Sequence, residues 1–436
     1  MKKASIWSDT VEIKRFPTLT KNIKTSVLVI GGGITGILCA YELTKRNINV
    51  ILVEQDTIGN GISKNTTAFI TAQHELLYQD IVKEYGIDAA ITYLNLNLKA
   101  VDKYKELGKQ YNIDYKKCSS ILFSSISEEK ILKEKETLEM LGYKTELIDE
   151  LPLENIEIKK GIKFNNQGQL HPLKLIKALS EKLKIYENTR IENIKGNRAY
   201  SKNNYIEFDN VIITTHYPCI NKTGLYFTKL YQRRSYVVAI KYPPIKDTYC
   251  SIDENGMYFR SYKDYLVIGG NDRDSKVECM HCFSEQIKKL FRLNELDYSW
   301  SNQDLMTIDE IPYIGKYDKW HKNWYVATGF NLWGFTWAMA SSFILADMIE
   351  GKEGIKLVSP QRWFIKKQLF SNLKTTLVNM LTFRRPRCTH LGVALKYNII
   401  EKTYECPAHG SRFNMEGKVI NGPAKKDSNS KKFDNK

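Results

Sequence analysis

Two sets of residues have the types and spacing that chemistry requires, and the first is a glycine-rich turn. Gly31, Gly33 and Gly36 form the pattern GxGxxG directly after the apolar run of residues 25–30. Between a strand and a helix, the first glycine permits the tight turn and the second lets the backbone approach a pyrophosphate. The third glycine lets the helix pack close to the strand. This turn therefore predicts a site for a phosphate-containing cofactor.

An acidic residue at the end of a second strand completes the unit. Residues 50–53 are again apolar, and Glu54 follows 18 residues after Gly36. The expected helix runs from about Ile37 to Lys45, and its free N–H groups stabilise phosphate charge. Ile34 and Thr35 lie in the turn before it and are predicted to bind the cofactor. A carboxylate at the place of Glu54 accepts hydrogen bonds from the hydroxyls of an adenosine ribose. The unit predicts a dinucleotide site rather than a ligand-free turn, but it leaves NAD and FAD both open.

The second set combines two cysteines with two histidines near the C-terminus. Cys388 and His390 form C-x-H, and after fifteen intervening residues Cys406 and His409 form C-x-x-H. Each loop thus offers one thiolate and one imidazole. A structural zinc site is the alternative, because two cysteines and two histidines also suit Zn²⁺. Zinc fingers usually keep like ligands together in one loop, whereas each loop here mixes them.

This pattern resembles a Rieske [2Fe–2S] site, in which two cysteines hold one iron and two histidines hold the other. The flanking HLG and HGS sequences and residues 422–424 also match the Rieske loops. The resemblance implies that the cluster ligands are Cys388, His390, Cys406 and His409. The usual β base before the first loop is missing, so we expect the module to need the rest of the chain for folding.

The segments around the dinucleotide site resemble the FAD-dependent amine and amino-acid oxidoreductase family, of the D-amino-acid oxidase and glycine oxidase type. The resemblance covers roughly residues 5–355 and includes a small-residue loop at 59–68 and a last glycine-rich turn at 327–336. It implies that the dinucleotide is FAD and that Thr66 and Thr67 lie along it. From the last turn it adds Gly329, Gly334, Phe335 and Thr336. No second GxGxxG is present, so a built-in NAD(P)H domain is not expected.

The elements that must position these residues indicate an α/β protein with a small β module. Residues 1–355 are expected to form the FAD-dependent oxidoreductase, with a Rossmann-type FAD-binding domain and an α+β substrate domain built on an antiparallel sheet. The FAD-binding parts are expected at about 20–75, 150–220 and 300–355, and the substrate parts at about 76–150 and 221–300. There follow an amphipathic helical linker at 356–386, the Rieske module at 387–424 and a disordered polar tail at 425–436.

Charge and composition limit the classes of partner that are expected for this chain. The 436 residues carry a formal charge of +16, which favours acidic partners or an anionic surface. The basic residues are scattered and no recognition motif for DNA or RNA is present, so nucleic acid is not expected. For the linker helix, we expect the apolar face to dock on the flavin domain rather than to lie on a membrane.

Cysteine usage and apolar segments indicate the compartment. The eight cysteines are spread over the chain, as reduced cytosolic thiols usually are. We interpret the closely spaced Cys279 and Cys282 as a chance pair rather than a metal or redox motif, because no second pair accompanies them. The most apolar window, residues 329–349, contains Asn331 and Asp347 and predicts a buried helix. Without a secretory signal, a cytoplasmic protein is expected.

Together the two resemblances imply an enzyme that oxidises CH–NH bonds. An amine or amino acid would give hydride to FAD, and the cluster would relay electrons to an external one-electron acceptor, which the positive charge suggests to be acidic. No catalytic residue is firmly indicated, and His74 and Arg260 are the weak candidates. The alternatives are electron flow from cluster to flavin, or a zinc-holding or docking module on a plain flavin oxidase.

Overall fold

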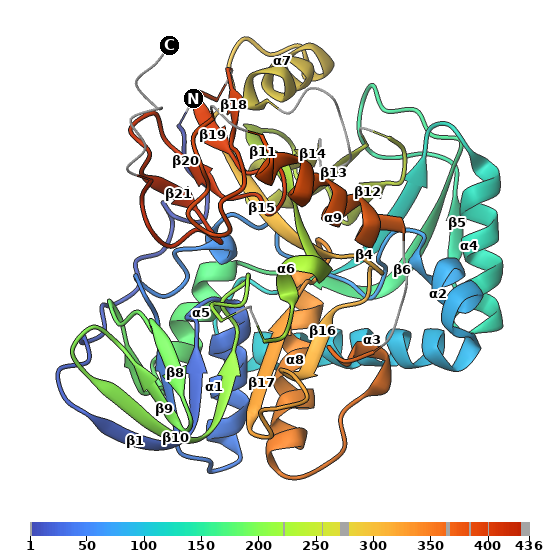
Figure 1. Ribbon diagram of the computed structural model, residues 1–436. Coiled ribbons are helices and arrows are strands. Elements are labelled where there is room, and N and C mark those ends of the chain that lie inside the picture. The colour runs from blue at the N-terminus through green and yellow to red at the C-terminus, as the bar shows by residue number, and fades with distance from the viewer. Residues whose placement is uncertain are drawn as a thin grey trace.

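Three β-sheets organise the part of the chain that the structure describes. The computed structural model describes residues 2–220, 223–254, 256–270, 279–362, 367–382, 385–399 and 401–428. Within these residues the strands form sheets of eight, nine and four strands. Figure 1 shows the eight-stranded sheet at the lower left, the nine-stranded sheet across the upper centre and right, and the four-stranded sheet in red at the upper left.

The eight-stranded sheet is a mainly parallel sheet with helices packed against it. Its strands are β1 (Ile23–Ile30), β2 (Val50–Val53), β7 (Ile185–Tyr186), β8 (Asn193–Lys195), β9 (Arg198–Tyr200), β10 (Tyr205–Ile213), β16 (Tyr313–Lys316) and β17 (Trp324–Thr328). The central order β17-β10-β1-β2-β7 is parallel throughout. The helices α1 (Ile34–Lys45), α5 (Pro172–Ser180) and α8 (Gly334–Ile349) pack beside it. The predicted Rossmann-type α/β domain is confirmed.

The nine-stranded sheet is built largely from the segments that are expected to form the substrate domain. It contains β3 (Phe69–Ile70), β4 (Lys116–Ser124), β5 (Glu146–Ile148), β6 (Lys160–Gln169), β11 (Leu230–Lys241), β12 (Thr248–Ser251), β13 (Met257–Tyr262), β14 (Tyr265–Gly270) and β15 (Tyr298–Thr307). All its pairs are antiparallel except β12 with β4. The ranges of β6 and β15 are expected in the FAD-binding part, but β6 pairs with β4 and β15 with β11.

Helices cover this second sheet and connect it to the first. They are α2 (Leu77–Tyr85), α3 (Ile87–Gln110), α4 (Glu128–Met140), α6 (Tyr226–Lys229) and α7 (Met280–Phe291). The long helix α3 packs on α8, so it ties the substrate domain to the parallel sheet. None of the helices among the described residues has the length and apolar character needed to span a lipid bilayer.

The third sheet belongs to the C-terminal module. Its strands are β18 (Lys396–Asn398), β19 (Thr403–Glu405), β20 (Arg412–Phe413) and β21 (Val419–Asn421), all antiparallel. Its small core includes Val393, Leu395 and Phe413. The prediction starts the disordered tail too early in the sequence, because Ser428 is still bonded to the module: its N–H donates to the Gly417 carbonyl at 2.8 Å. Residues 429–436 of that tail lie outside the described residues.

The linker helix α9 (Lys367–Met380) contacts α6 of the oxidoreductase part, but its last turn departs from the expected docking. Leu377 is 59% exposed and Leu381 just beyond the helix is 71% exposed, although both belong to its expected apolar face. Asn379 is buried instead, and Met380 packs against the core of the C-terminal module. The last turn of the helix is therefore held by the cluster module, and docking of its apolar face on the flavin domain is wrong for this turn.

Candidate functional site

The glycine turn between β1 and α1 has the close contacts that the sequence predicts. Gly31 has φ +113°, and a Cβ there would lie 2.8 Å from the Thr214 carbonyl oxygen of the neighbouring strand end. A Cβ at Gly36 would overlap the Gly31 carbonyl oxygen. At Gly33, by contrast, a Cβ would meet only the Ser63 hydroxyl, so this position leaves room for a ligand. The turn thus has glycine where the backbone is crowded or must be approached closely.

A large cavity opens at this turn. Its volume is about 820 Å³, within the range of small-molecule and cofactor sites. Nine of the residues predicted for the FAD site line it: Gly31, Gly33, Ile34, Thr35, Glu54, Thr66, Gly329, Gly334 and Phe335. The fold therefore brings together predicted site residues that lie about 300 positions apart in the sequence.

The Glu54 carboxylate holds the glycine turn as well as lining the cavity. It accepts hydrogen bonds from the N–H of Gly32 at 2.7 Å and from that of Asp56 at 3.0 Å. Burial raises the pKa of this carboxyl group, while the backbone donors oppose the shift. With the α1 N-terminus, the carboxylate supplies the acceptor and donor groups that the ribose and pyrophosphate of FAD need.

The remaining predicted FAD residues lie next to the cavity rather than on it. Thr67 lines a smaller adjoining pocket. Gly36 packs against the turn, and the Thr336 hydroxyl lies 3.1 Å from His74 Nε2. Gly36, Thr67 and Thr336 therefore pack next to the large cavity without lining it.

His74 does not face a cavity, so its proposed catalytic role lacks support in the structure. Its side chain is buried, with Nδ1 2.6 Å from the Tyr93 hydroxyl and the ring stacked on Trp333 at 4.7 Å. Burial lowers the pKa of His74 to about 3, so the ring is neutral. Because Trp333 precedes α8, His74 serves to position the start of that helix.

Arg260 is likewise committed to the protein itself. The guanidinium group is buried and its Nη1 donates to the carbonyls of Thr67 at 2.7 Å and Ala68 at 2.9 Å. It also donates to the Leu170 carbonyl at 3.2 Å. Arg260, a catalytic candidate from the sequence, therefore clamps the small-residue loop that carries Thr66 and Thr67.

The two C-terminal loops bring the predicted cluster ligands together. The Cys388 and Cys406 thiols are hydrogen-bonded to each other, and this bond lowers the pKa of Cys388 to about 7. Backbone N–H groups of residues 390–391 also donate to the Cys388 sulfur, and those of residues 408–409 to the Cys406 sulfur. Such donors stabilise thiolates, which are the form that binds iron.

The two histidines form the matching pair. The rings of His390 and His409 lie 5.0 Å apart, and burial lowers their pKa values to about 3 and about 4. Both imidazoles are thus neutral, as metal ligands must be. His409 Nε2 lies 3.0 Å from the Phe227 carbonyl oxygen, and its buried Nδ1 has no hydrogen-bond partner among the described residues. That nitrogen is available for an iron.

The arrangement in pairs matches two irons better than one zinc ion. In the described part of the chain, no three His, Cys, Asp or Glu side chains are placed to hold a single metal ion. In a Rieske cluster each iron takes only two protein ligands, the rest being bridging sulfides. Two cysteines beside two histidines meet that requirement.

Tyr217 joins the two sites. It lines the large cavity, and its ring lies edge-on to His390 at 5.5 Å and to His409 at 6.4 Å. Residues 422–425 of the cluster module line the same cavity. The sequence analysis did not name Tyr217 as a site residue, although it follows β10 at the carboxyl edge of the parallel sheet, where ligands of such folds bind.

Gln303 is a second contact that sequence reasoning missed. Its side-chain nitrogen donates to the Gly410 carbonyl at 2.7 Å, next to the ligand His409, and Gln303 also lines the large cavity. A glutamine in a strand carries no chemical signal of its own. Only the packing of β15 against the module reveals it.

The fold and the two sites define a flavoprotein oxidoreductase that carries an iron–sulfur domain. A family model described as FAD dependent oxidoreductase matches residues 26–348, and a Rieske [2Fe-2S] domain model matches residues 377–432. The chain belongs to the FAD-dependent oxidoreductase family and ends its matched region in a Rieske domain. FAD and a [2Fe–2S] cluster are its cofactors, and the cluster takes the place of the zinc alternative.

Individual relatives share this organisation in whole or in part. The chain is 32% identical to the putative Rieske 2Fe-2S iron-sulfur protein YhfW of Bacillus subtilis (strain 168), over 96% of this chain and 95% of that protein. It is 23% identical to the gamma-glutamylputrescine oxidoreductase of Escherichia coli (strain K12), over 77% and 86%. The structure of glycine oxidase from Geobacillus kaustophilus matches 78% of this chain and 100% of that chain, with a TM-score of 0.65 at 18% identity. The last likeness shows the fold alone.

Proposed function

We propose that the protein oxidises an amine or amino acid at the FAD site and passes the electrons through the Rieske cluster to an external acceptor. Bound FAD would supply the two-electron oxidation of a CH–NH group, giving an imine that water hydrolyses. A [2Fe–2S] cluster carries one electron at a time, so the pair suits a dehydrogenase that feeds a one-electron acceptor. The net charge of +16 favours an acidic acceptor.

The contact made by Tyr217 carries this proposal. The tyrosine lines the cavity of the FAD site and touches the rings of both cluster histidines. The side chain of Tyr217 therefore lies between the FAD cavity and the two histidines that are expected to bind one iron. A docking module without a redox role would not require two cluster ligands to lie next to a residue of the FAD cavity wall.

A smaller pocket beside the large cavity is the candidate place for the substrate. The smaller pocket shares Thr66 and Gly334 with the large cavity and also has Glu75, Asp304 and Tyr258 in its wall. None of the described residues that line this pocket is a lysine or arginine. The likeness to gamma-glutamylputrescine oxidoreductase favours an amine as the substrate.

An anaerobic substrate screen tests the proposal. Diamines, monoamines and amino acids are added to the holoenzyme without oxygen, while the flavin absorbance and the electron paramagnetic resonance signal of the reduced cluster are recorded. We expect amines to bleach the flavin first and the cluster signal to follow. Failure of every amine and amino acid would contradict the substrate class.

The same experiment determines the direction of electron flow. If the cluster feeds the flavin, chemical reduction of the cluster will reduce the flavin while amines leave it oxidised. That result would overturn the proposed direction but retain the electron transfer. Iron analysis is the remaining control, since two irons per chain are required.

A further inference from the structure

Cys279 and Cys282, treated in the sequence as a chance pair, form a disulfide at the first turn of α7. The other six cysteines are free thiols. The expectation that all the cysteines are reduced is therefore wrong for this pair. Cys279 caps the helix, and its sulfur accepts a hydrogen bond from the Cys282 N–H at 2.9 Å. The CxxC pair is thus built into a helix N-terminus.

The two sulfur-bearing residues differ in exposure. Cys279 is fully buried, whereas Cys282 is half-buried. A thiolate from solution therefore reaches Cys282 more readily. Cleavage then leaves Cys279 as the thiolate, at the position where the helix N-terminus and the Cys282 N–H stabilise negative charge. A stabilised leaving thiolate speeds thiol–disulfide exchange.

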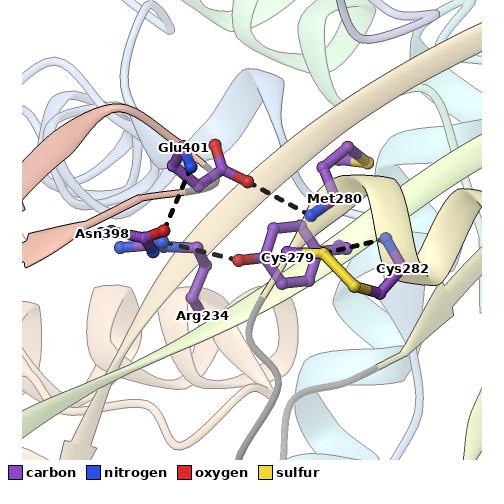
Figure 2. The surroundings of a disulfide bond; sticks show 7 residues. Arg234, Cys279, Met280, Cys282, Asn398 and Glu401 are labelled. Atoms are coloured by element: carbon purple, nitrogen blue, oxygen red, sulfur yellow. Dashed lines mark hydrogen bonds between the residues drawn. A yellow bond between two sulfur atoms is a disulfide. The ribbon is translucent and has the colours of Figure 1, made fainter.

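The disulfide lies against the cluster module. The N–H of Met280, between the two cysteines, donates to the Glu401 carboxylate at 3.2 Å, and Figure 2 shows Glu401 between Met280 and Asn398. The other Glu401 oxygen lies 3.8 Å from the Arg412 guanidinium group. Arg412 follows Ser411, whose hydroxyl bonds the cluster ligand Cys388. The Glu401 carboxylate thus connects the helix turn that carries the disulfide with Arg412, on the strand that follows the second cluster loop.

We propose that Cys279 and Cys282 form a second redox site, which exchanges with a dithiol and regulates the hold of α7 on the cluster module. A thiolate of the dithiol attacks the Cys282 sulfur, the protein disulfide breaks and Cys279 leaves as a thiolate. The second thiol of the dithiol then attacks the mixed disulfide and frees Cys282. The protein disulfide gains two electrons and one proton, so that Cys279 stays a thiolate and Cys282 becomes a thiol, and the dithiol becomes a disulfide.

Reduction changes the charge next to Glu401. The Cys279 thiolate and the Glu401 carboxylate then compete for the N–H groups of the same helix end and repel each other. The hydrogen bond from Met280 to Glu401 weakens as a result. In the disulfide form the sulfurs carry no charge, and Glu401 has the helix end to itself. The oxidised pair therefore favours the docked module.

A trapping experiment tests the exchange chemistry. Holoenzymes with Cys279→Ser or Cys282→Ser are treated with glutathione disulfide, and the intact mass is recorded. We expect a stable mixed disulfide on Cys282 in the first variant and none on Cys279 in the second over the same time. The variant Cys39→Ala removes a cysteine elsewhere and should leave the pair intact.

Hydrogen exchange tests the regulation and does not depend on the substrate. Wild-type holoenzyme is compared in reduced and oxidised dithiothreitol, with flavin and cluster absorbance recorded to show that both remain bound. We expect exchange in residues 279–291 and 401–405 to be about two- to five-fold faster in the reduced form. Glu401→Gln should reduce this difference, whereas Glu416→Gln, at an exposed position of the same module, should preserve it.

Three results would overturn the inference. They are a pair that dithiothreitol cannot reduce in the folded holoenzyme, zinc bound to the purified pair, and equal exchange in the two redox forms. Each can occur while the flavin and cluster still react as proposed, so failure here is distinguishable from failure of the proposed function.

Discussion

The ring of Tyr217 connects the two cofactor sites, and this connection can be tested directly. Tyr217→Leu removes the aromatic contact with His390 and His409. We expect cluster reduction after substrate addition to slow by about tenfold, equivalent to about 1.4 kcal/mol in the barrier. Stopped-flow absorbance under anaerobic conditions measures the rate.

Tyr217→Phe is the matched control. The Tyr217 hydroxyl is buried and has no hydrogen-bond partner among the described residues, so its loss costs little. The phenylalanine variant should transfer electrons at nearly the wild-type rate. Equal rates in the leucine variant would show that electrons pass elsewhere.

Glu134 gives a prediction about pH and stability. Its buried carboxylate accepts hydrogen bonds from the N–H groups of Tyr78 and Gln79 at the start of α2, and burial raises its pKa from 4.5 to about 7. Between these values the folded state keeps a proton that the unfolded state has lost, so stability decreases as pH rises. The loss is on the order of 3 kcal/mol and is complete above the folded-state pKa.

Thermal denaturation between pH 4.5 and 8 checks this effect. Glu134→Gln cannot titrate, so its melting temperature should fall less across the window than that of the wild type. Glu129→Gln, at an exposed position on the same helix, should follow the wild-type curve. Parallel curves for the wild type and Glu134→Gln would contradict the raised pKa.

At the residue scale, the spacing of residue types predicted the cofactor ligands, but it did not predict which side chains the packing would bury or bring into contact. Cys388 and His409 can be predicted because each of the two loops carries one cysteine and one histidine, as in a Rieske site. His74 and Arg260 were misjudged because their partners, Tyr93 and the loop carbonyls, lie far away in sequence. Tyr217 was overlooked since its contact exists only after two domains pack together.

At the element scale, a buried ion pair joins β11 to the cluster module. Arg234 lies 2.9 Å from Glu405 on β19, and both are largely shielded from water. Arg234→Met leaves Glu405 with Arg412 as its cation, so the module should lose about 1.5 kcal/mol of its hold on β11, the contribution of one hydrogen bond to a charged group. We expect limited proteolysis to cut residues 362–387 faster in this variant.

The control is an exposed pair of the same kind. Arg198 on β9 contacts Glu207 at 3.1 Å near the surface, where such pairs contribute little. Arg198→Met should leave the proteolysis rate unchanged. Equal rates in both variants would show that β11 does not hold the module.

Local patterns predicted the strands of this fold more readily than their partners. The run at 25–30 and the glycine turn specified β1 and α1, because hydrophobic period and turn chemistry are local. The pairing of β6 with β4 and of β15 with β11 depends on contacts between distant segments. The α9 pattern likewise indicated a helix but not the module that covers its last turn.

At the scale of the whole molecule, the cluster should help to retain FAD. Residues 422–425 line the FAD cavity, and the Ala424 N–H donates to the Ser411 hydroxyl at 2.9 Å, beside Cys388. Cys406→Ser, which removes a cluster ligand, should loosen this wall. We expect the FAD dissociation constant to rise by about tenfold, or about 1.4 kcal/mol.

Flavin fluorescence after dilution measures the released FAD. Cys118→Ser, in β4 of the substrate domain, is the control and should retain FAD as the wild type does. Unchanged retention in Cys406→Ser would show that the module wall stands without its cluster.

The shared wall of the FAD cavity also constrains how the protein is made. The glycine turn at residues 31–36 leaves the ribosome long before residues 422–425, yet both border the same cavity. A nascent chain therefore presents an open half-site, and flavin bound at that time can still escape. We expect enclosure to wait until the iron–sulfur loops are translated and folded, so that the maturation of one cofactor would control the capture of the other.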